Sequence, residues 1–435
     1  MPPAAAKAKH RSPNGATYNF NGDGVLATLI RPFTGLRPTP TQAATVAAPP
    51  YDVLNTAEAR ERAAGKPNSF LHISKPEIDL PADTDPYAPA VYAKGAENLK
   101  RLVDAGVLMR DTSPHYYVYR LRMGGHVQTG FVAAASVAAY DINRIRKHEF
   151  TRPDKEDDRV RQIEALNAQT GPVLLAYKAQ NDVQAIIDGV AKTAPLYEVT
   201  ADDGIVHTIW RMDDAAAIAQ LTELVDAMTA LYIADGHHRS AAASRVAAAR
   251  RGKGKSDSAE YFLAVAFPHD QMRIFDYNRV IKDLNGLTSD AFLAKIKERF
   301  DVTSAATQVK PDKPTRFGMY LDGKWYQLDI HQNLVPTADP VARLDVSLLQ
   351  DNLIAPILGI ADPRRDKRID FVGGIRGLKE LEKRVNNGEM KVAFSLHPTT
   401  LEQLMAVADA DQVMPPKSTW FEPKLADGLV SHVID

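Results

Sequence analysis

Hydrophobic and polar positions over the first 300 residues form two kinds of segment, short apolar runs and longer amphipathic stretches. The amphipathic stretches have the period of helices, which we predict over 56–64, 88–103, 154–169, 182–192 and 213–228. The apolar runs predict strands over 172–177, 196–200, 205–211, 230–235 and 261–267. Two further runs, 115–123 and 127–137, lie on either side of Gly124 and Gly125, and this arrangement predicts a hairpin.

The C-terminal third begins with a linker-like stretch, 303–315, which is followed by a predicted hairpin with Asp322-Gly323 at its turn. Helix and strand patterns then follow one another over 346–358, 368–372, 375–386, 391–396 and 400–409. Because helices and strands mix without strict alternation, we predict an α+β fold with mixed sheets. We expect a disordered leader over residues 1–20. The rest of the two-lobe chain is expected to form three parts, over residues 21–200, 201–302 and 303–435.

Composition narrows the possible classes of protein. The 435 residues are 45% hydrophobic, enough for large cores, and 53 basic residues balance 54 acidic ones. This balance argues against a nucleic-acid partner. The chain has no cysteine, which excludes disulfides, thiolate catalysis and cysteine-bound metals. No apolar run approaches the roughly 20 residues that span a bilayer, so we expect a cytoplasmic protein with a small-molecule substrate and no membrane partner.

The sequence "ADGHHR" is the first candidate site. A predicted strand ends at Asp235, and Gly236 leads into a predicted helix that opens with His237, His238 and Arg239. The free N–H groups at a helix start favour a phosphate, and the arginine adds a planar fork of donors. Two alternatives stay open. The aspartate could simply cap the helix beside surface histidines, or the histidine pair could bind a metal, although adjacent side chains diverge.

The second candidate is "RKHEFTRPDKEDDR", residues 146–159. Arg152 could neutralise a phosphate, and Glu149 or Asp157 could act as a base or hold Mg²⁺. His148 and Glu149 precede the predicted helix, and we therefore assign them to the site. The acids that follow have an alternative explanation, because an acid-rich first turn suits the helix dipole.

Two further segments carry weaker signals. In "MPPKSTWFEPK", residues 414–424, prolines stiffen a backbone on which Lys417, Ser418 and Thr419 could bind phosphate or a substrate carboxylate. The alternative is a rigid tail packed on the surface. In "PPYDV", Tyr51 and Asp52 follow two prolines and are lesser candidates for the same site. Neither a Walker loop nor a GxGxxG turn is present.

Five motifs occur in order and span nearly the whole chain: "PFTGLRP", "APPYDV", "KHEFTRPDKEDDR", "ADGHHR" and "MPPKSTWFEPKLADGLV". Together they resemble the bacterial and archaeal family called domain of unknown function 1015, whose name carries no activity. The turn from Asp235 to Arg239 is also similar to the phosphate-gripping motif of the ParB/sulfiredoxin superfamily, whose members bind nucleotides at a helix start. That resemblance implies a nucleotide-binding lobe of this type within the larger two-lobe chain.

Within that superfamily, sulfiredoxin chemistry requires a cysteine, and partition proteins carry a helix-turn-helix that this sequence lacks. The branch of free serine kinases fits. We therefore predict a phosphotransferase that uses ATP or ADP with Mg²⁺ and acts on a small hydroxyl-bearing metabolite such as serine. Glu149 would be the base, and the turn around Gly236 would hold the polyphosphate. The alternatives are a non-catalytic nucleotide or phosphometabolite sensor, a phosphatase and a metal-dependent hydrolase. The oligomeric state stays open.

Overall fold

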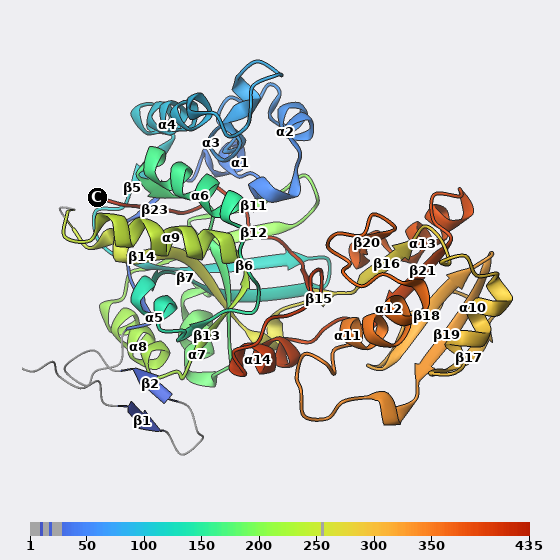
Figure 1. Cartoon of the computed structure of the whole chain (residues 1–435). Helices are drawn as coiled ribbons and strands as arrows, with labels where there is room; N and C mark the ends of the chain where they lie inside the picture. The colour runs from blue at the N-terminus through green and yellow to red at the C-terminus, as the bar shows by residue number, and fades with distance from the viewer. Residues whose placement is uncertain (1–8, 12–16, 20–27, 254–255) are drawn as a thin grey trace, which may run out of the picture. The chain divides into compact units, whose positions relative to one another are not determined.

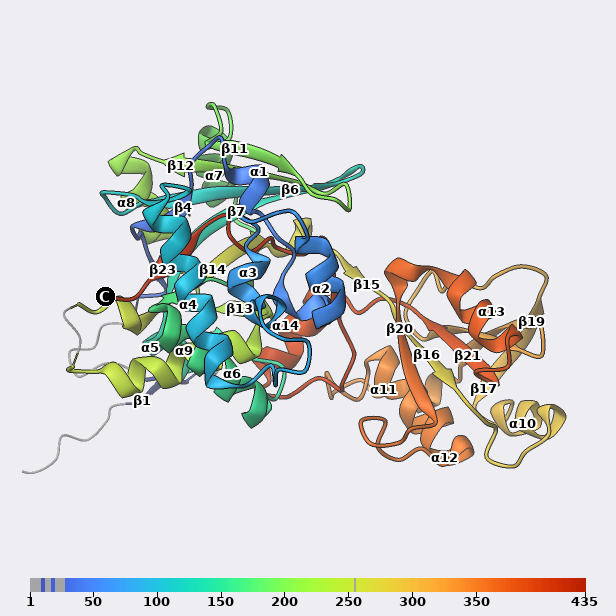
Figure 2. The same ribbon diagram turned by 90° about the horizontal axis from the view of Figure 1, so that it is seen from above.

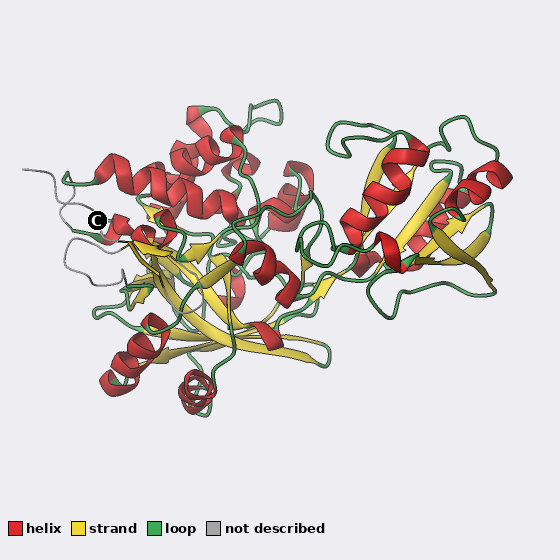
Figure 3. Ribbon diagram, turned by 60° about the horizontal axis from the view of Figure 1, so that its bottom comes forward, coloured by secondary structure: helices red, strands yellow, loops and turns green. Residues whose placement is uncertain are grey.

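The computed structural model describes residues 9–11, 17–19, 28–253 and 256–435, and it confirms the α+β class. The chain divides into two compact units (Figures 1 and 3). Unit 1 comprises Met1–Gln271 and Pro423–Asp435, and unit 2 comprises Met272–Glu422. This division differs from the expected boundaries at 200/201 and 302/303. The first of these falls between two strands that pair with each other, and the second falls inside a strand.

The leader expected over residues 1–20 lies mostly outside the described residues. Within it, β1 (Lys9–Arg11) pairs antiparallel with β2 (Thr17–Asn19).

The main sheet of unit 1 has nine strands within the described part of the chain. Their order is β11 (Tyr197–Thr200), β12 (Val206–Met212), β6 (Tyr116–Met123), β7 (His126–Ser136), β14 (Tyr261–Pro268), β10 (Val173–Tyr177), β13 (Leu231–Asp235) and β8 (Ile145–Arg146), while β3 (Ile30–Arg31) pairs with β7. The sheet is mixed, because β14 and β10 run parallel, as do β13 and β8, whereas the other pairs are antiparallel. The predicted hairpin is β6 and β7.

Unit 1 also contains helices within the described residues. They are α1 (Ala43–Val46), α2 (Thr56–Ala63), α3 (Leu71–Ser74), α4 (Pro89–Asp104), α5 (Val137–Asp141), α6 (Pro153–Leu166), α7 (Asn181–Val190), α8 (Ala215–Asp226) and α9 (His237–Arg250). Figures 1 and 2 both show α6 beside α9. Ala242 and Val246 of α9 pack with Ile163 of α6, and the small side chains of the alanine-rich α9 allow this close approach. The loops that enter α6 and α9 are thereby brought together.

The C-terminal strand completes unit 1. In a four-stranded sheet, β23 (Ser431–Val433) lies between β4 (Gly35–Pro38) and β9 (Ala168–Gln169), and β5 (Leu108–Arg110) pairs with β4. A backbone bridge between Ala48 and Asp427 extends this pairing. The last residues of the sequence therefore lie against the segment around "PPYDV".

Unit 2 is built on a six-stranded antiparallel sheet. The order is β17 (Phe300–Ala305), β19 (Lys324–Ile330), β18 (Arg316–Leu321), β21 (Val392–Leu396), β16 (Tyr277–Ile281) and β20 (Ile369–Gly373). A separate pair consists of β15 (Ile274–Phe275) and β22 (Trp420–Phe421). The helical elements are α10 (Ser289–Ile296), α11 (Asp345–Leu349), the π-helix η6 (Gln350–Ile354), α12 (Ala355–Leu358), α13 (Leu378–Asn386) and α14 (Leu401–Asp409).

The expected linker over 303–315 is partly wrong, because residues 303–305 continue β17 and pair with β19. The expected hairpin is correct, and Asp322 and Gly323 form its turn with φ of 48° and 77°. Across the described ranges, no helix combines the length and the apolar character needed to cross a membrane.

Candidate functional site

The start of α9 is formed by a glycine in a conformation that other residues rarely adopt. Strand β13 ends at Asp235, and Gly236 follows with φ of 102° before the helix begins at His237. A Cβ atom at Gly236 would lie 3.1 Å from Arg239 Nε and 3.3 Å from Val173 Cα. No side chain caps this helix, so Asp235 is not the N-cap that one alternative required. The first N–H groups of α9 have no intrahelical partners.

Arg239 is fixed against this turn. Its Nη1 donates to the carbonyl oxygen of Pro172, and its Nη2 lies 3.6 Å from Asp235 Oδ2 and 3.7 Å from Asp52 Oδ2. The side chain is only 10% exposed. Burial acts to lower the pKa of Arg239, but the nearby carboxylates, Asp235 first, raise it above its usual value. The guanidinium is therefore charged and held in one place.

Asp235 is paired from two sides. Lys424 Nζ donates to its Oδ2 at 3.3 Å, and Arg239 contacts the same oxygen. Burial acts to raise the pKa of Asp235, but these two cations lower it below its usual range, so the carboxylate stays ionised. Asp235 thus orients both cations.

The two adjacent histidines bind the loop that precedes α6. His237 Nε2 accepts the backbone N–H of His148 at 3.3 Å, and His238 Nε2 accepts that of Arg152 at 3.1 Å. Their divergence is what lets each reach a different amide of this loop. Because Nε2 accepts in both rings, the proton of the neutral imidazole lies on Nδ1. Burial lowers the pKa of His237 well below its usual value, so this ring is neutral at pH 7.

His148 and Glu149 lie beside this helix start. The ring of His148 meets that of His237 edge to face, with centroids 4.4 Å apart, and burial lowers the pKa of His148 to about 4. The His148 ring is therefore neutral at pH 7 and only weakly basic. Glu149 Oε2 lies 3.7 Å from His237 Nδ1, and its side chain is 60% exposed. Glu149 can therefore be reached from solvent.

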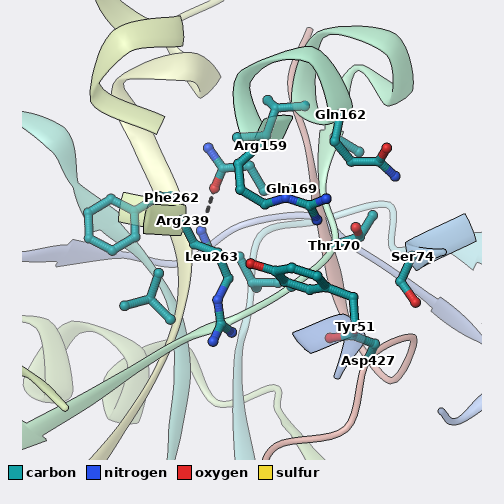
Figure 4. A pocket seen from close by; sticks show the side chains of 14 residues that line it. Tyr51, Ser74, Arg159, Gln162, Gln169, Thr170, Arg239, Phe262, Leu263 and Asp427 are labelled. Atoms are coloured by element: carbon teal, nitrogen blue, oxygen red, sulfur yellow. Dashed lines mark hydrogen bonds between the residues drawn. The ribbon is translucent and has the colours of Figure 1, made fainter. Parts of the chain in front are cut away.

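Arg239 also lines a cleft that encloses about 470 Å³, part of it open to solvent (Figure 4). The guanidinium of Arg159, from α6, lies 3.9 Å over the ring of Tyr51. Asp427 lies on another wall and is 1% exposed, and its Oδ1 has no hydrogen-bond partner. Burial and then the charge of Asp52 raise the pKa of Asp427 to about 7, although Arg239 acts to lower it.

The other predicted residues are placed differently. Asp157 pairs with Arg245 on α9 at 2.7 Å, away from the helix start. The side chain of Arg152 is 64% exposed and pairs with Asp154, so only its backbone contacts His238. Lys417, Ser418 and Thr419 belong to unit 2. There the Ser418 hydroxyl donates to the carbonyl oxygen of Pro415, a local turn contact.

Sequence reasoning missed three residues of the site: Arg159, Lys424 and Asp427. All three lie in motifs that the sequence singles out, at the end of "KHEFTRPDKEDDR" and in "FEPKLADGLV". The available signal was their place in these motifs. The motifs did not show which polar side chains face inward. That depends on which face α6 turns to its neighbours and on the backbone bridge at Asp427.

No group of three or more histidine, aspartate or glutamate side chains that could hold a metal forms among the residues that the structure describes. The Nε2 atoms of both histidines of α9 already accept backbone amides. This arrangement counts against the alternative in which the histidine pair binds a metal. Asp52 and Glu149 carry partly exposed carboxylate oxygens, the type of group that binds Mg²⁺ in proteins.

Solved structures similar to this chain are distant. Free serine kinase in complex with AMP has 13% identity, covers 64% of this chain and 84% of that chain, and has a TM-score of 0.31. A mutant of free serine kinase in complex with ADP has 14% identity, the same coverages of 64% and 84%, and a TM-score of 0.30. SbnI with a C-terminal truncation from Staphylococcus aureus has 11% identity, covers 68% and 84%, and has a TM-score of 0.36. At these TM-scores the similarity does not assign a function to this chain.

No curated protein matches the sequence. A family model, described as "Protein of unknown function (DUF1015)", matches residues 30–347, which is most of the chain and includes both the loop before α6 and the start of α9. The chain therefore belongs to the DUF1015 family.

Proposed function

We propose that this protein is a nucleotide-dependent phosphotransferase that acts on a small hydroxyl-bearing metabolite such as serine. The observation that supports this most is the start of α9, where Gly236 at φ 102° brings free N–H groups and the Arg239 guanidinium to one place. A phosphate is the ligand that such a helix start favours. Because Asp235 and Pro172 already fix the arginine side chain, its contact with a phosphate loses little further conformational entropy.

The polyphosphate of ATP or ADP would lie at the first turn of α9, bound by the amides and by Arg239. Mg²⁺, held by Asp52 or Glu149 together with phosphate oxygens, would supply neutralisation of the phosphate charge. The cleft beside Arg239 would take the acceptor, since Thr170, Gln162 and Asp427 offer it polar partners.

The transfer itself balances simply. The acceptor oxygen forms a bond to the terminal phosphorus, the bridging oxygen leaves with the shortened nucleotide, and a carboxylate takes the hydroxyl proton. Two carboxylates are candidates for that base. Glu149 lies 3.7 Å from His237 Nδ1, and Asp52, which is 40% exposed, lies 3.7 Å from Arg239 Nη2.

Glu149→Gln and Asp52→Asn would identify the base. Loss of a positioned base lowers turnover by about 10²–10⁴-fold and leaves nucleotide affinity near that of the parent. Asp157→Asn is the matched control, because that carboxylate pairs with Arg245 and should not affect turnover. Product formation is followed by phosphorus NMR. Full turnover in both site variants would contradict a carboxylate base here, and tight binding without turnover in the parent would favour the sensor.

Phe150 offers a surface for the nucleobase. It follows Glu149 in the loop before α6, and 75% of its surface is exposed, which is unusual for a phenylalanine. Stacking of a base on an aromatic ring contributes about 1–3 kcal/mol. Phe150→Ala should therefore weaken ATP binding by about that amount and leave the binding of inorganic phosphate unchanged. Equal affinity for ATP in the variant would remove the ring from the site.

The binding claim is tested first with thermal shifts of the full chain in ATP, ADP and inorganic phosphate, with and without Mg²⁺. Arg239→Gln should weaken nucleotide binding by about 1.5–3 kcal/mol, the usual size of a charge-assisted contact. Arg245→Gln is the control, since this arginine lies on the same helix but is 46% exposed and pairs with Glu156 and Asp157. If neither nucleotide nor phosphate stabilises the parent, the proposal is wrong.

A further inference from the structure

Unit 2 carries a buried arginine that no acid neutralises among the described residues. Arg279, in β16, is 5% exposed, and its Nη1 donates to the backbone oxygen of Tyr277. Its guanidinium carbon lies 5.2 Å over the ring of Phe371, its cross-strand neighbour on β20. Burial lowers the pKa of Arg279 to about 10, so the group is still charged at neutral pH. A buried charge without a counter-ion is costly, and proteins normally pair it.

A second cation borders the same group of rings. Lys417, from the "MPPKST" segment, places its Nζ 5.5 Å from the centroid of the Tyr277 ring. Tyr277 in turn packs edge to face on Phe371 and on Trp420, with centroids 6.0 Å and 5.3 Å away. Within the described ranges, neither Arg279 nor Lys417 forms a salt bridge.

The local backbone is built to allow this arrangement. Tyr277 lies directly opposite Gly373 on β20, and a Cβ atom there would come within 2.8 Å of the Trp420 ring. Only a glycine lets the indole lie on the strand at this position. Along β16, Tyr277 and Arg279 are two residues apart, so their side chains leave the same face of the sheet. Asp276 and Asn278, which hydrogen-bond to each other, leave the opposite face.

We propose that Arg279 and Lys417 form an anion site in unit 2, beside the Tyr277, Phe371 and Trp420 rings, that binds a phosphate or carboxylate group of a small molecule. A compact oxyanion would supply the counter-charge that Arg279 lacks, and the planar guanidinium suits the oxygens of either group. All five residues belong to unit 2, and the proposal does not depend on the function proposed for unit 1. It gives the "MPPKST" segment a role that the unit 1 site leaves unassigned.

The test uses the full chain with Arg239→Gln, so that anion binding at α9 is weakened. Inorganic phosphate and malonate are titrated while tryptophan fluorescence is followed, because Trp420 packs on Tyr277 and Gly373. We expect a saturable change with at least one of the two anions, and its absence when Trp420→Phe is added. The arm that responds identifies the phosphate or the carboxylate as the preferred group. No saturable change with either anion would overturn the proposal.

Variants separate a ligand site from a structural arginine. Arg279→Gln and Lys417→Gln should each weaken anion binding by about 10-fold or more, whereas Arg376→Gln, an exposed arginine of the same unit, should not. Without anion, Arg279→Gln should unfold at the same urea concentration as the parent or a higher one, since an unpaired buried cation is removed. Unchanged affinity in both site variants would refute the site. If Arg279→Gln does not fold, the anion affinity of Lys417→Gln and the titration of the parent test the site.

Discussion

Gly236→Ala is the sharpest test of the idea that a glycine is required at this point in order to build a phosphate site. At φ 102° an alanine enters a backbone region that L-residues disfavour, at a cost of about 1–2 kcal/mol. Its Cβ would also lie 3.1 Å from Arg239 Nε and 3.3 Å from Val173 Cα, closer than ordinary contacts. The valine atom is backbone in the middle of the sheet, so the arginine has to move.

We therefore expect two effects. The free energy of unfolding should fall by about 1–3 kcal/mol, from the backbone strain together with the crowding. Affinity for ATP should fall as well, because the displaced guanidinium no longer lies at the start of α9. A hydrogen bond from a charged donor such as Arg239 contributes about 1.5–3 kcal/mol, which sets the size of the expected decrease in binding free energy.

Gly204→Ala is the matched control. Gly204 has φ of 81° in the turn between β11 and β12, and a Cβ atom added to it would have no other atom within 4 Å. The Gly204→Ala variant should lose stability from the backbone strain alone, without steric crowding, and should bind ATP as tightly as the parent. Stability is measured by urea unfolding, and affinity by titration calorimetry with ATP. If Gly236→Ala binds ATP as the parent does, or if Gly204→Ala loses affinity equally, the reasoning is refuted.

Two other predictions concern protonation and the histidine pair. Burial holds the pKa of Asp427 near 7 against an ordinary 3.8, so between about pH 4 and 7 only the folded state keeps this proton. Stability relative to Asp427→Asn should then fall by about 1.4 kcal/mol per unit as pH rises from 5 to 7, and a flat difference in urea unfolding would contradict this. His237→Ala leaves the buried His148 amide without an acceptor and should cost about 2–4 kcal/mol, whereas His238→Ala, which serves the more exposed Arg152 amide, should cost under about 1. Equal decreases in stability would refute this assignment.

The sequence alone determined most of the local structure. The periods of apolar residues located α4, α6 and α8 and the strands around them, because a segment must turn one face to a core whatever its partners are. The place of Gly236 directly before a helix start is likewise visible in the sequence, and the structure gives this glycine a φ of 102°. Such features depend on neighbours within a few residues, which a sequence displays directly.

What only the tertiary structure decided is which distant side chains meet. Asp427 reaches the site because the C-terminal segment bridges to Ala48, and Lys424 reaches Asp235 for the same reason. The histidine pair binds the loop before α6 because α6 and α9 pack together. Asp157, by contrast, lies on α6 where it meets Arg245. Contacts of this kind arise from burial summed over a whole unit, and the order of residues in a motif does not encode the direction in which each side chain points.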